Sequence, residues 1–220
     1  MEKKRAYDEG CAAAHALDLV GERWALLVVR ELLVGPKRFT DLKAGLPHVS
    51  PNVLSGRLRD LEAVGAVGRT RLPPPAAAQV YELTPWGRDL EPVLMALGRW
   101  GVRSPAMPFT APTSVAALVV ALRTMFDPDL AGGFTGTVEL RFGEERFRGA
   151  VVDGRLVLER GPAERPDVMI TSDTETLKGV AFGGLPLSAA QETGALTLTG
   201  DPKQAERFFG LFGLPEPVVP

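Results

Sequence analysis

Residues 48–65, HVSPNVLSGRLRDLEAVG, carry the clearest structural signal in the first half of the chain. Ser50 and Pro51 are residue types that favour the first turn of a helix, serine as the N-cap and proline just after it. Three leucines then recur at the spacing of one helical face: Leu54, Leu58 and Leu61. The stretch therefore predicts a helix that begins at a fixed point and packs by one side.

The opposite face of this helix carries small, polar and basic side chains: Asn52, Ser55, Gly56, Arg59 and Ala63. Small residues let a helix approach the floor of a major groove, and asparagine and arginine can each form paired hydrogen bonds with a base. A solvated surface face is the alternative reading, because amphipathic helices are common.

The flanking segments favour the DNA interpretation. A short helix over residues 39–46 and the turn 47–50 precede the stretch, and a hairpin with a proline-rich tip follows it, which is the order of a winged helix-turn-helix. Basic residues before the first helix and on the hairpin are placed to reach phosphates. We therefore assign these residues to DNA: Lys37, Arg38, Thr40, Ser50, Asn52, Ser55, Arg59, Arg69 and Arg71. Arg57 lies at the edge of the leucine face, and we expect it to form a structural ion pair.

A further helix is predicted over residues 85–101, capped by Thr84 and kinked at Pro92. Its apolar face is wide for its length, so it is a candidate dimer interface, with burial in its own domain as the alternative. The candidate interface residues are Trp86, Leu90, Leu94, Leu97 and Trp100.

Residues 8–102 resemble the HxlR family of bacterial regulators through the ordered motifs ERW, GPKRF, LSGRLRDLE and YELTPWG. The resemblance implies a dimeric winged helix-turn-helix transcription factor whose second motif helix enters the major groove. Gly56 departs from the larger residue expected there, so no base contact is assigned to it. Members of the family can sense oxidants or electrophiles through a cysteine near the N-terminus. Cys11 occupies such a place, and a packed, inert thiol is the alternative.

The second half of the chain predicts a different fold class. Residues 105–112 are proline-rich and aperiodic, as in a linker, so we expect a DNA-binding and dimerisation domain over 1–104 and an effector domain over 113–220. Alternating strands, the Asp153-Gly154 hairpin signal and helix starts at Asp173 or Ser172 and at Asp201 predict an α+β domain, an antiparallel sheet with helices on one face.

The order of these elements over residues 110–214 resembles the sterol-carrier-protein-like fold. That resemblance implies a cavity for a hydrophobic small molecule. Candidate lining residues are Phe126, Phe134, Phe182, Leu185, Phe208 and Phe212, and ordinary core packing is the alternative for each.

Charge and composition limit the remaining functions. Residues 1–105 carry 15 basic against 12 acidic side chains, whereas residues 106–220 carry a net charge of −5, so the halves should have different partners. With two histidines, one cysteine and no phosphate-binding loop or nucleophile elbow, we expect no cofactor, no metal site and no enzyme activity. A single cysteine and the absence of a long apolar run favour the cytoplasm and no membrane association.

Together these patterns predict a homodimeric regulator that binds a double-stranded DNA operator and whose DNA affinity a hydrophobic small molecule changes. Two alternatives stay open. One is a thiol-based sensor acting through Cys11. The other is a carrier of hydrophobic ligands whose winged helix serves only dimerisation.

Overall fold

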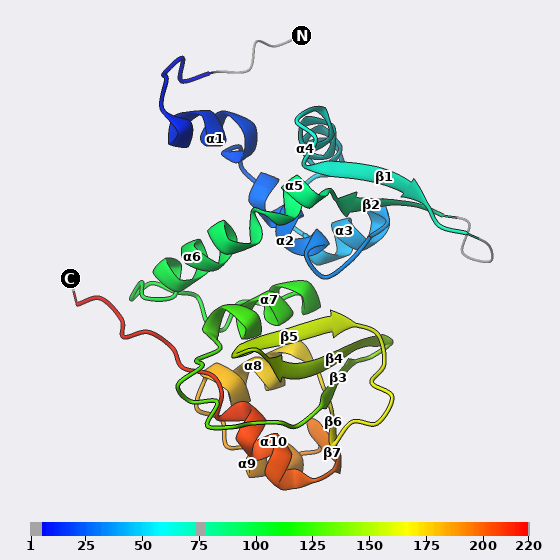
Figure 1. Ribbon diagram of the computed structural model, residues 1–220, viewed down its shortest axis with the longest axis vertical. Helices are drawn as coiled ribbons and strands as arrows, with labels where there is room; N and C mark the ends of the chain where they lie inside the picture. Colours follow the sequence, from blue (N-terminus) through cyan, green and yellow to red (C-terminus); the bar gives the residue numbers. More distant parts are fainter. Residues whose placement is uncertain (1–5, 74–77, 220) are drawn as a thin grey trace. The chain divides into compact units, whose positions relative to one another are not determined.

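The computed structural model describes residues 6–73 and 78–219, and the chain divides into two compact units, Met1–Leu94 and Met95–Pro220. The first unit contains α1 (Ala12–Val20), α2 (Ala25–Leu32), α3 (Phe39–Gly45), α4 (Pro51–Ala63), β1 (Val67–Arg71), β2 (Gln79–Leu83) and α5 (Pro85–Arg88) (Figure 1). Helix α6 (Glu91–Gly101) begins in the first unit and ends in the second.

The core of the first unit is built from one face of each helix. Leu54, Leu58 and Leu61 of α4 are fully buried, and α4 packs against α2 and β1. Burial of one leucine side chain contributes about 1.5–3 kcal/mol. The leucine spacing of α4 therefore fixes which of its faces turns outward.

The wing is an antiparallel hairpin of β1 and β2, in which Arg69 lies opposite Tyr81. Lys37 forms an isolated antiparallel β-bridge with Tyr81 of β2. Its backbone N–H donates to the Tyr81 C=O, and its C=O accepts the Tyr81 N–H. The expected proline-rich tip falls on residues 74–77, which lie outside the described residues.

The single helix expected over residues 85–101 is wrong, because the segment forms two helices. Thr84 caps α5 as predicted, accepting a hydrogen bond of 3.0 Å from the Gly87 N–H. Pro92 is the second residue of α6, where the missing N–H would have no helical partner, so the proline starts a helix rather than kinking one.

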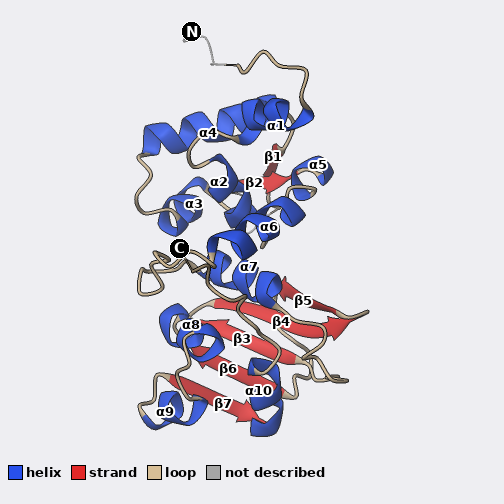
Figure 2. Cartoon of the chain, turned by 90° about the vertical axis from the view of Figure 1, so that its left-hand side faces the viewer, coloured by secondary structure: helices blue, strands red, loops and turns tan. Residues whose placement is uncertain are grey.

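The second unit is an α+β fold, as predicted. Its elements are α7 (Val115–Met125), β3 (Val138–Phe142), β4 (Glu145–Val152), β5 (Arg155–Arg160), β6 (Val168–Ser172), α8 (Thr174–Phe182), α9 (Leu187–Glu192), β7 (Leu196–Gly200) and α10 (Pro202–Phe209). The sheet order is β5-β4-β3-β6-β7, and the strands are seen side by side in Figure 2.

The sheet is mixed rather than wholly antiparallel, because β3 and β6 pair in parallel while the other three pairs are antiparallel. Strand β5 lies at one edge of the sheet. After it the chain crosses to the far side of β3, where β6 runs in the same direction as β3. Asp153 and Gly154 turn β4 into β5 with φ of 50° and 70°, the left-handed conformations of a tight hairpin. Asp173 and Asp201 cap α8 and α10 as expected.

The helices pack on the sheet through an apolar layer. Helix α7 packs against β5, α9 against β7, and α10 against β6 and β7. Phe147 and Leu158 point into this layer and are fully buried, while Val157 and Glu159 on the other face of the sheet are exposed. Among the described residues, no helix combines the length and the apolar character that crossing a membrane requires.

Candidate nucleic-acid interface

Helix α4 is positioned as a recognition helix by its start and by its packed face. The Ser50 side chain accepts the Val53 N–H at 3.3 Å, and Pro51 occupies the first helical position. Lys43 donates to the Pro47 carbonyl at 2.8 Å and so closes the turn between α3 and α4. The helix-turn-helix predicted from these residues is therefore present.

The outward face of α4 presents the residues expected to read bases. Asn52 and Arg59 are exposed, and Ser55 and Gly56 are partly exposed. Arg59 makes one long contact, 3.4 Å from its Nε to the Ser55 carbonyl. Nothing lies within 4 Å of the place that a Cβ on Gly56 would take. This face is open to a ligand over two turns of the helix.

Arg57 is held in the structural ion pairs that the sequence predicts. Its guanidinium lies 3.1 Å from the Asp60 carboxylate and 3.4 Å from that of Glu22. These contacts tie α4 to the segment before α2. Arg57 therefore does not share the open face of the helix.

The residues around α4 that the sequence assigns to DNA contacts are of three kinds: exposed, exposed but ion-paired, and buried. The exposed ones are Arg38, Thr40, Ser50 and Arg71. Arg69 is exposed but paired: its guanidinium bonds to Glu62 at 2.5 Å and lies over the Tyr81 ring. The Glu62 carboxylate raises the pKa of the Arg69 guanidinium further above its usual range.

Lys37 is the exception, and its assignment to DNA is wrong. Its side chain is buried, and its ammonium donates to the fully buried Glu31 carboxylate at 2.7 Å. The bridge to Tyr81 turns the lysine inward, because it fixes the backbone of Lys37 against the wing. Lys37 therefore joins α2 to the wing and is not available to phosphate.

Sequence reasoning missed Glu31 and the glycine that accommodates it. A Cβ on Gly45 would collide with the Glu31 carboxylate, so α3 needs glycine at this point to pack on α2. Arg30 donates a second hydrogen bond to Glu31 at 2.9 Å. Glutamate within an apolar helix, six residues before a lysine, was the available signal.

The candidate dimer residues are not buried within the chain. Trp86, Leu97 and Trp100 are exposed, Trp100 by 77%, and Leu90 and Leu94 are partly exposed. Helix α6 contributes no fully buried residue among those described.

Cys11 is exposed and is the N-cap of α1. The backbone N–H groups of Ala14 and Ala13, in the first turn of α1, lower the pKa of its thiol, because they stabilise the thiolate. No group of three or more potential metal ligands is found in the part of the chain that the structure describes.

The predicted ligand residues of the second unit mostly form a packed cluster. Phe208 contacts Phe134 and Phe212 at ring separations of 6.4 and 5.2 Å, and Phe182 contacts Phe212 at 6.0 Å. Phe134, Phe208 and Phe212 are buried, and Leu185 is 37% exposed. Among the six, only Phe126 lines a cavity of about 550 Å³ at the ends of α6 and α7. The core interpretation thus fits the other aromatic residues of the set.

A recognition helix, its supporting helix and a wing define a winged helix-turn-helix protein of the transcription-regulator class. Residues 19–106 match the HxlR-like helix-turn-helix family. Over 85 residues the chain is 40% identical to the uncharacterized HTH-type transcriptional regulator YvaP of Bacillus subtilis, covering 39% of this chain and 79% of that one. The chain belongs to the HxlR-like helix-turn-helix family.

Residues 110–219 match the alkyl sulfatase C-terminal family, a sterol-carrier-like region, as the sequence resemblance predicts. Two solved structures are similar to parts of the chain. The reduced form of the transcriptional regulator YodB from B. subtilis is 32% identical, covers 46% of this chain and 98% of that one, and has a TM-score of 0.40. The sec-alkylsulfatase Pisa1 from Pseudomonas sp. is 27% identical, with a TM-score of 0.42. That match covers 47% of this chain and only 17% of the sulfatase.

Proposed function

We propose that the chain is a homodimeric, non-enzymatic regulator that binds a double-stranded DNA operator in the cytoplasm. The observation that carries the proposal is the outward face of α4, where Asn52, Ser55 and Arg59 stand clear of the core that the leucines fill. Arg59 pairs with a guanine, and Asn52 with an adenine, in a major groove. Arg38 and Arg71 contact phosphates on either side of the groove.

The proposed dimer forms through α5 and α6. Trp86, Leu97 and Trp100 expose large apolar surfaces on these two helices, which a partner subunit would cover. Two-fold symmetry then places two copies of α4 about one helical turn of DNA apart. Residues 1–104 would serve DNA binding and dimerisation, residues 105–112 would serve as the linker, and residues 113–220 would take a hydrophobic effector that changes DNA affinity.

The experiment is a fluorescence-polarisation titration with DNA that flanks the protein's own coding region. Arg59→Ala should weaken binding to that DNA by about 1–3 kcal/mol and leave binding to unrelated DNA nearly unchanged. Arg155→Ala is the matched control, because Arg155 is an exposed arginine of β5, outside the helix-turn-helix and the wing. No binding at low salt, together with a co-purifying lipid seen by mass spectrometry, would favour the carrier alternative.

A thiol sensor is a second candidate function, favoured by the exposure of Cys11 and the lowered pKa of its thiol. Because the folded protein holds more thiolate at a given pH than a free cysteine does, Cys11 should react faster with a mild oxidant or an electrophile. The expected result is release of DNA after diamide treatment in the wild-type protein and not in Cys11→Ser. Equal release by both proteins contradicts the sensor.

A further inference from the structure

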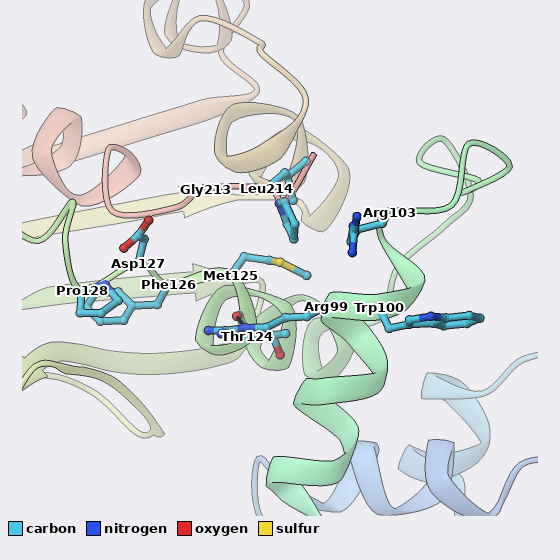
Figure 3. A pocket seen from close by; sticks show the side chains of 11 residues that line it. Arg99, Trp100, Arg103, Thr124, Met125, Phe126, Asp127, Pro128, Gly213 and Leu214 are labelled. Atoms are coloured by element: carbon cyan, nitrogen blue, oxygen red, sulfur yellow. Dashed lines mark hydrogen bonds between the residues drawn. The ribbon is translucent and has the colours of Figure 1, made fainter. Parts of the chain in front are cut away.

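A cavity of about 550 Å³ lies within the second unit, and its walls come from three segments far apart in the sequence (Figure 3). They are the end of α6 with the turn after it, the end of α7 with its following loop, and the C-terminal segment after α10. Its volume is in the range of small-molecule sites, roughly 300–1,000 Å³. Met125, Phe126 and Leu214 supply apolar walls.

Two arginines line this cavity, and each donates one hydrogen bond, from its Nε, to a backbone carbonyl. The Arg99 Nε donates to the Thr124 carbonyl at 2.8 Å, and the Arg103 Nε donates to the Glu216 carbonyl at 3.0 Å. Within the described chain, the terminal nitrogens of both guanidiniums have no assigned hydrogen-bond partner. Arg99 also acts as an ordinary cap, because Thr124 lies in the last turn of α7. Arg103 has no such role, because Glu216 lies in no helix.

The charges of the cavity are unequally distributed. Asp127 is its one acidic lining residue, and its carboxylate accepts the Asp129 N–H at 2.9 Å. In the view of Figure 3, Asp127 and Arg103 lie at opposite ends of the cavity. The end at Arg103 is therefore cationic, and the guanidinium fork matches the geometry of a carboxylate or sulfate.

We infer that this cavity binds a small anionic amphiphile. Its carboxylate or sulfate head group pairs with Arg103, and its apolar chain lies against Met125, Phe126 and Leu214. The ligand then lies at the end of α6, outside the packed phenylalanine cluster.

This position matters for the proposed function, on which the regulatory part of the inference rests. Arg99 and Arg103 lie in the part of the chain that matches the HxlR-like family, while the apolar walls lie in the alkyl sulfatase C-terminal match. Helix α6 also carries Leu97 and Trp100 of the proposed dimer interface. A ligand that contacts the end of α6 can favour one dimer geometry over another by its difference in affinity for the two.

The test is a calorimetric titration of the full chain with three probes of equal chain length: octanoate, octyl sulfate and octanol, the anions at concentrations where they are monomeric. The two anions should bind at least about tenfold more tightly than octanol, as expected for a charge-assisted hydrogen-bond pair. The stronger of the two anions then identifies the head group.

Arg103→Gln should remove most of the preference for the anions and leave octanol binding unchanged. Arg155→Gln is the matched control and should bind all three probes as the wild type does. Arg99→Gln is a second variant, with its melting temperature measured because it also loses a helix cap. Equal binding of anions and octanol, no binding at all, or full retention of the preference in Arg103→Gln would each overturn the inference.

DNA titrations on the same samples distinguish failure of the proposed ligand site from failure of the proposed DNA-binding function. Operator binding without anion binding would remove the ligand site and leave the regulator. Anion binding without operator binding would keep the site and remove the regulator.

Discussion

Replacing Gly56 with alanine should move stability and DNA affinity in opposite directions. Gly56 lies within α4 on its outward face, and nothing lies within 4 Å of an added Cβ. Glycine in a helix interior costs about 0.5–1 kcal/mol relative to alanine. Without a steric penalty in the free protein, Gly56→Ala should raise the free energy of unfolding by about that amount.

The same methyl group should weaken operator binding if the backbone of α4 approaches the groove floor closely. An extra methyl in a packed interface costs about 1–3 kcal/mol. That corresponds to a loss of roughly fivefold to a hundredfold in operator affinity, because 1.4 kcal/mol is a factor of ten. Binding to unrelated DNA, which depends mainly on phosphate contacts, should change little.

Two measurements on Gly56→Ala check this reasoning: urea denaturation and a polarisation titration with operator and unrelated DNA. A variant that is more stable and still binds the operator with wild-type affinity would refute the close approach of α4 at this residue. A variant that is less stable would refute the claim that its Cβ meets open space.

Three further outcomes follow from the contacts. Lys37→Met should lose about 1.5–3 kcal/mol in urea unfolding, because it removes one of the two cations, Lys37 and Arg30, that pair with the fully buried Glu31 carboxylate; an unchanged midpoint contradicts this. Arg71→Ala should weaken binding to all DNA alike and reduce the slope of affinity against salt by about one. A sequence-specific loss would argue against a phosphate contact. Leu97→Glu should give a monomer in light scattering, since it places a charge in the proposed interface; a persisting dimer would place the interface elsewhere.

Local sequence signals predicted the parts of the fold that depend on neighbouring residues. Ser50 and Pro51 begin α4, and the leucine spacing identifies its packed face, because a cap and a helical period are properties of a short segment. Asp153 and Gly154 identify the β4–β5 turn for the same reason.

Features that depend on distant segments were not predictable in this way. The inward turn of Lys37 depends on Tyr81, which lies more than forty residues later in the sequence. The parallel β3–β6 pair depends on which edge of the sheet the chain joins after β5. The cavity at Arg99 and Arg103 needs the C-terminal segment, so no local motif marks it.

A methylation-protection footprint of guanine N7 on the flanking DNA decides whether α4 reads the major groove. This atom lies in the major groove, where Arg59 is proposed to bind it. We expect protected guanines in two half-sites about one helical turn apart, with that protection lost in Arg59→Ala and kept in Arg155→Ala. Specific DNA binding without any protected guanine N7, or protection that survives in Arg59→Ala, would contradict this expectation.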